Sequence, residues 1–208
     1  MSTSASSASA AALERRDVRT IVGGGVKLGV ATVVGVVVFV LLSRALSGRV
    51  EVVVQSIVVL AGGALASYLP AYWVRPCTID AIGWSTLLGF LGAVVFTFID
   101  TAVLRPVQLY PWTWDAIGGG SGWWYIPIWW MGSAFLAWLG AWVYSARAQG
   151  AAVVNVPGLA AQTVGLALVL FVLLKVTGIA RVHPAVAALS YSLGLVIHVP
   201  IATTLSRR

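Results

Sequence analysis

Six long apolar runs constrain this chain more than any other feature of its sequence. They cover roughly residues 22–43, 52–73, 81–103, 123–145, 157–179 and 184–205. A helix needs about 20 apolar residues to cross the hydrocarbon core of a bilayer, and each run has that length. The runs do not alternate polar and apolar residues as barrel strands do, and a single segment in lipid must satisfy its own backbone hydrogen bonds. The sequence therefore predicts an all-α integral membrane bundle of six transmembrane helices.

The composition shows why a bilayer, and not water, must surround this chain. Of its 208 residues, 60% are hydrophobic and 9% are charged, whereas a soluble domain carries about 25% charged residues. The net charge of +7 is spread singly or in pairs between the apolar runs. That distribution is typical of membrane-flanking charge and differs from the clustered charge of a nucleic-acid surface. We expect the lipid bilayer as a partner and no nucleic acid.

The first 20 residues differ from the remainder of the chain. Residues 1–20 are rich in Ser and Ala and then basic, so we expect a disordered or surface-lying cytoplasmic tail. The apolar run behind this tail is longer than the roughly 7–15 residues of a secretory signal. Residues 21–208 are expected to form a single polytopic transmembrane domain. Arginines are in excess in the tails and even-numbered connections, which predicts cytoplasmic termini in a prokaryotic inner membrane.

The connection between the third and fourth runs is unusually aromatic. Residues 109–130, LYPWTWDAIGGGSGWWYIPIWW, hold six of the ten tryptophans. An interfacial belt explains indoles at a membrane surface, but a belt distributes them over many helix ends. The alternative is a loop that turns at residues 118–120 and covers an outward-facing cavity, to which a cationic or aromatic ligand would bind. Its ligand and lid residues would be Trp112, Trp114, Asp115, Ser121, Trp123 and Trp124.

Ionisable side chains inside the runs are few, and each is a candidate functional group because its burial in lipid is costly. Lys27 and His198 lie at similar depth near the cytoplasmic ends of their runs, and Asp100 and Lys175 lie near the outer ends of theirs. We therefore expect two pairs, Lys27 with His198 and Asp100 with Lys175. The alternatives are snorkelling lysines, an ion pair of Asp100 with Arg105, and a hydrogen bond of His198 within the bundle.

One short motif resembles that of an enzyme family. The sequence GGSG at 119–122 is similar to the G-x-S-G of rhomboid intramembrane proteases, which also have six spans and a histidine in the sixth. The resemblance implies a serine nucleophile at Ser121 and a base in the sixth span. Depth opposes it, because His198 would lie about 20 Å deeper than Ser121. The family's Trp-Arg pair in the first outer loop is also absent. An intramembrane serine hydrolase is thus an alternative for which no catalytic residue is assigned.

Residue counts also limit cofactors and indicate how the helices pack. Two histidines and one cysteine offer no ligand set for a haem, an iron–sulfur cluster or a metal ion, so no cofactor is expected. Small residues four apart predict close helix packing and are compatible with a homo-oligomer. These pairs are Gly25 and Gly29, Gly62 and Ala66, and Gly89 and Ala93.

Two functions are consistent with these observations. The first is a transporter, channel or membrane-embedded substrate-binding subunit with an outward-facing cavity for a small-molecule ligand under the 109–130 loop. In size and span count the chain is similar to the vitamin-binding subunits of energy-coupling-factor transporters, although it carries no motif of that family. The second is a non-catalytic structural or assembly subunit that packs on partner membrane subunits. The concentrated aromatics favour the first function, and the scarcity of intramembrane polar residues favours the second.

Overall fold

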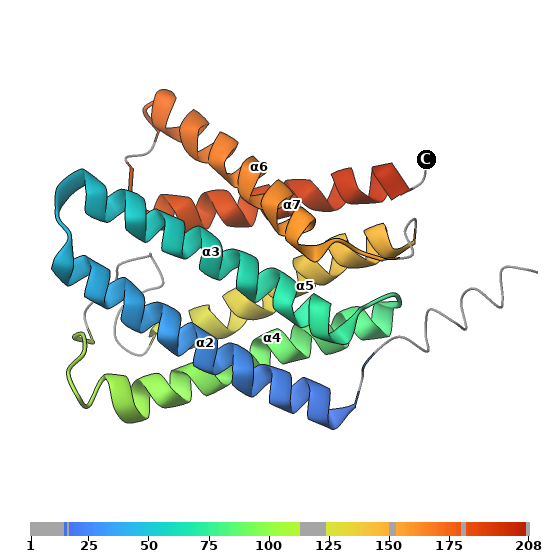
Figure 1. The fold of residues 1–208 in the computed structure, drawn as a ribbon, viewed down its shortest axis with the longest axis horizontal. Coiled ribbons are helices and arrows are strands. Elements are labelled where there is room, and N and C mark those ends of the chain that lie inside the picture. The colour runs from blue at the N-terminus through green and yellow to red at the C-terminus, as the bar shows by residue number, and fades with distance from the viewer. Residues whose placement is uncertain (1–14, 16, 113–123, 150–152, 180–181, 207–208) are drawn as a thin grey trace, which may run out of the picture.

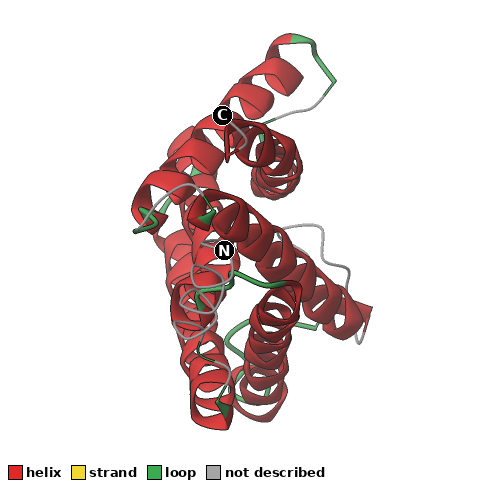
Figure 2. Cartoon of the chain, turned by 90° about the vertical axis from the view of Figure 1, so that its right-hand side faces the viewer, coloured by secondary structure: helices red, strands yellow, loops and turns green. Residues whose placement is uncertain are grey.

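The computed structural model describes residues 15, 17–112, 124–149, 153–179 and 182–206. Six helical segments in it are long and apolar enough to cross a membrane (Figure 1). They are α2 (Val18–Ala45), α3 (Gly48–Val74), α4 (Ile79–Ile99) with its continuation η1 (Asp100–Leu104), α5 (Tyr125–Ala148), α6 (Val156–Val176) and α7 (Pro184–Ser206). The described residues contain helices and loops and no strand (Figure 2). The predicted all-α architecture of six long apolar helices is confirmed; most of the predicted tail at 1–20 lies outside the described residues.

Local sequence signals set the helix ends. Asp17 begins α2, because its side chain accepts hydrogen bonds from the Thr20 amide at 2.8 Å and the Thr20 hydroxyl at 2.7 Å. Arg75 ends α3 in the left-handed region, at φ 56°, immediately before a proline. Asn155 begins α6 by accepting a hydrogen bond from the Gly158 amide at 3.0 Å. Short connections at 46–47 and 75–78 join α2, α3 and α4, which run alternately in opposite directions (Figure 1).

Helices α3, α4 and α5 connect the two sides of the bundle. On one side α2 packs on α4, and on the other α7 packs on α3 and α5. Helix α6 packs mainly on α7, and its buried residues are Leu159, Thr163 and Ala167. The C-terminal part of α6 stands away from the other helices (Figure 1, Figure 2). This part is lined with exposed valines and leucines, which suits contact with lipid.

Two of the three predicted small-residue pairs lie at helix contacts. A Cβ added to Gly25 or Gly29 would come within 2.8 or 2.6 Å of α4, and one added to Gly89 would come within 2.4 Å of α5. The pair Gly62 and Ala66 is not such a contact, because a Cβ on Gly62 would meet nothing within 4 Å. Spacing alone shows that two small residues share a face, but it does not show which face meets a neighbour.

Two further glycines, which the spacing did not indicate, hold α3 close to its neighbours. A Cβ on Gly140 of α5 would lie 2.1 Å from the carbonyl oxygen of Ser67. A Cβ on Gly63 would lie 2.7 Å from the ring of Tyr191 on α7. A side chain at Gly140 would require the α3 backbone to move, and one at Gly63 would require the buried Tyr191 ring to shift, so both glycines permit the close approach of α3 to α5 and α7.

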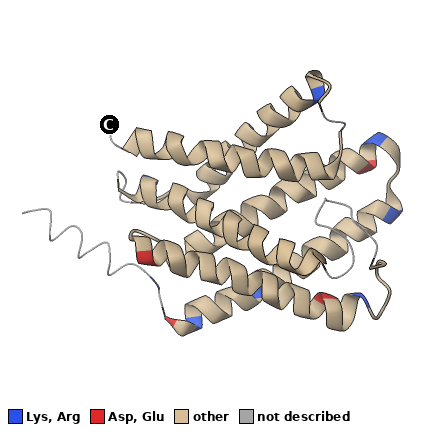
Figure 3. Cartoon of the chain, turned by 180° about the vertical axis from the view of Figure 1, so that it is seen from behind, with Lys and Arg blue, Asp and Glu red and all other residues tan. Residues whose placement is uncertain are grey.

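The two ends of the bundle carry different connections. We call the end with residues 46–47, 105–112 and 177–179 the far end, and the end with Asp17, Ser206 and residues 75–78 and 153–155 the termini end. Charged residues lie mostly toward these two ends and leave most of the helical length uncharged (Figure 3). A chain that crosses a bilayer needs this distribution, because charges in the hydrocarbon core are costly.

Candidate functional site

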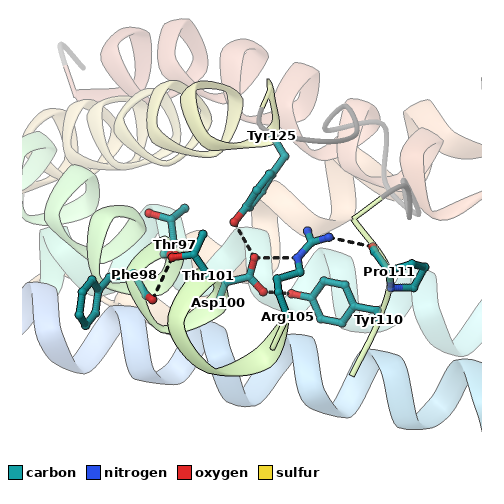
Figure 4. Close-up of polar contacts among 8 residues, drawn as sticks. All are labelled: Thr97, Phe98, Asp100, Thr101, Arg105, Tyr110, Pro111 and Tyr125. Atoms are coloured by element: carbon teal, nitrogen blue, oxygen red, sulfur yellow. Dashed lines mark hydrogen bonds and ion pairs between the residues drawn. The ribbon is translucent and has the colours of Figure 1, made fainter. Parts of the chain in front are cut away.

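The first polar group lies at the far end, around the fully buried Asp100. Asp100 begins the π-helical segment η1, in which the Arg105 amide donates to the Asp100 carbonyl five residues before it, at 2.9 Å. In an α-helix, residues five apart point about 140° apart. The wider π turn brings both side chains to one side. As a result, Arg105 Nε donates to Asp100 Oδ2 at 3.1 Å (Figure 4).

Two tyrosines complete the hydrogen bonding of this carboxylate. Tyr125, the first residue of α5, donates its hydroxyl to Asp100 Oδ2 at 2.6 Å, and Tyr110 donates its hydroxyl to Oδ1. Tyr110 reaches Asp100 because the connection turns back at Gln108, which has φ 55°. Burial, and then the hydrogen bond to Asp100, raise the pKa of Tyr110. The phenol therefore stays protonated and acts as a donor.

The Arg105 guanidinium is enclosed by aromatic rings. Its Nη1 donates to the carbonyl of Pro111 at 2.8 Å. Three rings lie against its central carbon: Tyr110 at 4.4 Å, Trp112 at 4.6 Å and Tyr125 at 4.8 Å. This group resembles the arrangement predicted for a cationic ligand, but only one of its rings is an indole, its carboxylate is Asp100 and not Asp115, and its cation is the chain's own Arg105.

The predicted lid is described only at its two edges. Trp112 lies over Arg105, and the side chain of Trp124 is 60% exposed. Trp129 and Trp130 belong to α5 and pack on α4, where Trp130 Nε1 donates to Thr97 Oγ1 at 3.0 Å. The other predicted lid residues lie outside the described part of the chain: Trp114, Asp115, Ser121 and Trp123. Part of the aromatic richness therefore serves the contact of α4 with α5.

The structure shows neither of the two predicted pairs, Asp100 with Lys175 and Lys27 with His198. Asp100 pairs with Arg105, the alternative partner, whereas Lys175 is exposed near the far end of α6, a helix that packs mainly on α7. Lys27 is exposed on α2, while His198 is buried in α7 on the other side of the bundle. Matched depth suggested both pairs, but depth does not determine which helices are neighbours.

The second polar group lies within the bundle, where α3, α6 and α7 meet. Thr163 Oγ1 is 2.7 Å from His198 Nδ1 and 2.6 Å from the hydroxyl of Tyr68. The Tyr68 hydroxyl is itself 3.3 Å from His198 Nδ1. The alternative expectation, a hydrogen bond of His198 within the bundle, is confirmed. Tyr68 and Thr163 were not predicted; a hydroxyl inside an apolar run was the only available signal.

One edge of the His198 ring has no partner. Its Nε2 is buried and makes no hydrogen bond to any described residue. Thr163 Oγ1 also lies 3.2 Å from the carbonyl of Leu159, so its proton points either away from His198, to that carbonyl or to the Tyr68 hydroxyl, or toward His198. In the first case Nε2 is left as an acceptor, and in the second it carries a proton. In both cases the buried Nε2 atom has no hydrogen-bond partner among the described residues.

The serine hydrolase alternative gains no support from the two histidines. His198 lies in the half of α7 nearer the termini end, and His183 begins α7 by accepting a hydrogen bond from the Ala185 amide at 3.1 Å. Ser121 lies outside the described residues, so its relation to either histidine stays a prediction. Within the described part of the chain, no three His, Cys, Asp or Glu side chains gather as a metal site.

A cavity of about 300 Å³ opens at the termini end, between the C-terminal ends of α5 and α7 and the N-terminal end of α6. Its polar lining residues are Arg147, Asn155, Gln162 and Ser206, and its remaining walls are largely apolar. The cavity therefore lies at the end of the bundle opposite to Trp112 and Trp124, the two described edges of the predicted lid.

Comparisons of the chain with protein-family models, with curated proteins and with solved structures found no match. The function must therefore be argued from geometry. The far-end group is complete in itself, whereas the group at α3, α6 and α7 has an open hydrogen-bonding position.

Proposed function

We propose that this multi-pass membrane protein binds a small solute inside the bundle and carries it across the bilayer. The supporting observation is His198 Nε2, which is buried and without a hydrogen-bond partner among the described residues. Buried polar atoms without a partner are rare and call for an explanation, such as a bound molecule. Ionisable groups inside a membrane bundle commonly mark solute or proton pathways.

The solute would enter from the termini end. The cavity there lies beside the half of the bundle that holds His198, and Gln162, which lines it, precedes Thr163 in the chain. At the far end, by contrast, the Asp100 carboxylate has three donors and the Arg105 guanidinium is covered by rings. The solute would thus still be transported, as the sequence predicts, but it would enter at the termini end and not under the 109–130 loop.

We infer from the arginine distribution that the termini end faces the cytoplasm of a prokaryotic cell. Cysteine labelling in a Cys77→Ser background tests this orientation. Val107→Cys at the far end should react with an impermeant reagent in intact cells, and Val153→Cys at the termini end should not. The opposite labelling pattern would reverse the orientation and leave the bound solute unaffected.

The solute-binding proposal is tested by purification in mild detergent followed by native mass spectrometry. We expect a small molecule that co-purifies with the wild type and is lost from His198→Ala and Thr163→Val. Thr86→Val is the matched control, because its hydroxyl donates only to the carbonyl of Ile82. A molecule retained by all three variants would contradict the site. The identified compound is then followed by flux into proteoliposomes.

A second candidate function is a structural subunit of a larger membrane complex. The observation that favours it is the exposed apolar face of α6, which includes Val169, Val172 and Val176. Partner subunits, or a second copy of the chain, would pack on this face in place of lipid. Native mass spectrometry separates the two functions, since a stoichiometric partner protein without any small molecule would favour this second candidate.

A further inference from the structure

We propose that the cavity at the termini end is a binding site for an oxyanion, a phosphate or carboxylate group, held by Arg147 and Gln162. This inference deepens the proposed function because it names the chemical class of the solute. It rests on that function only for transport; anion binding itself follows from the side chains that line the cavity.

Arg147 is the cation of this site. It lies in the last turn of α5 and is half-buried, and its guanidinium makes no hydrogen bond or ion pair with any described residue. Its Nε is buried without a partner. A guanidinium offers five donors and cannot lose its charge in a protein, so its partial removal from water requires a counter-charge.

The described residues supply no such counter-charge at the cavity, because none of its lining residues carries a carboxylate side chain. The lining does contain amide side chains. Gln162 lies about 9 Å beyond the start of α6 and makes no hydrogen bond to any described residue. Asn155 uses its Oδ1 to accept from the Gly158 amide, so its side-chain N–H groups are the part left to donate. Donors without acceptors of their own therefore surround the cavity.

The first turn of α6 is not what holds the anion. The amide of Val156 donates to the carbonyl of Val154, residue 157 is a proline, and the Gly158 amide donates to Asn155. With these amides occupied, the contacts must come from side chains. A guanidinium bonds two oxygens of a phosphate or carboxylate in parallel, and the Gln162 amide can donate to a third. The largely apolar walls around them suit the organic part of such a molecule.

This chemistry has two sources, a lipid headgroup phosphate and a free anion in solution, which two measurements on the full-length protein distinguish. In uncharged detergent, inorganic phosphate is titrated while thermal unfolding is followed by tryptophan fluorescence, with sodium chloride at matched ionic strength as the reference. In nanodiscs of phosphatidylcholine with phosphatidylglycerol, native mass spectrometry detects retained anionic lipid. Saturable stabilisation by phosphate identifies a free anion, and lipid retention alone identifies a headgroup.

In whichever measurement the wild type binds, Arg147→Gln should weaken binding by about tenfold or more. Gln162→Leu should weaken binding less. This variant leaves the Arg147 charge and α5 intact, so it provides the test if Arg147→Gln does not fold. Arg19→Gln is the control, an exposed arginine at the same end on α2. Absence of binding in both measurements, or equal weakening by Arg19→Gln, would overturn the site. If anion binding depends on Arg147 but the His198→Ala variant loses no co-purifying molecule, the anion site stands and the proposed function is refuted.

Discussion

Two arginines at opposite ends of the bundle show how differently one side chain can be accommodated near a membrane. Arg105 has a carboxylate, a carbonyl and three aromatic rings around its guanidinium. Arg147 has no hydrogen bond or ion pair to any described residue, although it too is partly withdrawn from solvent. Residues of the described part of the chain surround Arg105 with partners and provide no hydrogen-bond or ion-pair partner to Arg147.

The difference distinguishes a structural group from a binding group. A buried charge whose partners all belong to the chain holds the fold in one arrangement, and it offers nothing to a ligand. A partly buried charge without such partners leaves an interaction to be completed from outside. The same contrast separates the carboxylate of Asp100, with three donors, from the ring of His198, with one unused nitrogen.

The largest effect is expected when the buried ion pair is broken. Arg105→Met should lower the free energy of unfolding by about 3–5 kcal/mol, because it leaves the Asp100 carboxylate buried without its cation. The double variant Asp100→Asn with Arg105→Met should lose less than the worse of the two single variants. Thermal unfolding in detergent measures both. Lys175→Met is the control, and a loss of similar size there would revive the pair predicted from depth.

A much smaller effect on stability is expected at His198. Replacement by leucine removes one hydrogen bond and also the unpartnered Nε2, while Thr163 keeps Tyr68 and the Leu159 carbonyl. The free energy of unfolding should therefore change by no more than about 1 kcal/mol. The same thermal unfolding assay applies. A loss as large as that of Arg105→Met would make His198 a structural residue and end the contrast between the two groups.

The smallest effect is expected at Trp112, one of the three rings around Arg105. Trp112→Leu should cost about 0.5–1 kcal/mol, because the indole is 45% exposed and the other two rings stay in place. Urea unfolding in detergent measures this change. The double variant Arg105→Met with Trp112→Leu shows whether the cost of losing the indole depends on Arg105. If Trp112→Leu costs as much without Arg105 as with it, the ring does not act through the cation.

The six helices could be predicted because the signal is long and additive. Each apolar run spans about 20 residues, so single exceptions such as Pro70 or Pro200 inside α3 and α7 do not remove it. Helix ends are also set locally, by the side-chain caps of residues such as Asp17 and Asn155, although the apolar runs alone did not identify them. These features depend on residues that are close together in the sequence, so the sequence itself contains the information that sets them.

The partners inside the bundle could not be predicted in the same way. Asp100 and Arg105 share a face only because of a π turn, and an α-helical spacing of five residues places them apart. Tyr68 meets Thr163 only because α3 and α6 are neighbours near α7. An all-apolar helix shows little periodicity, so its sequence does not indicate which face turns inward.

The attachment of α6 has a mechanical consequence. Its buried residues Leu159, Thr163 and Ala167 are spaced four apart, so they form a single stripe along one side of the helix. Partly buried Ala160, Val164 and Phe171 widen this side against the same core. Thr163 lies on the attached side beside His198, whereas Gln162 projects about 100° away from it and lines the cavity. Any rotation of α6 about its attached side would therefore move Gln162 at the cavity more than it moves Thr163.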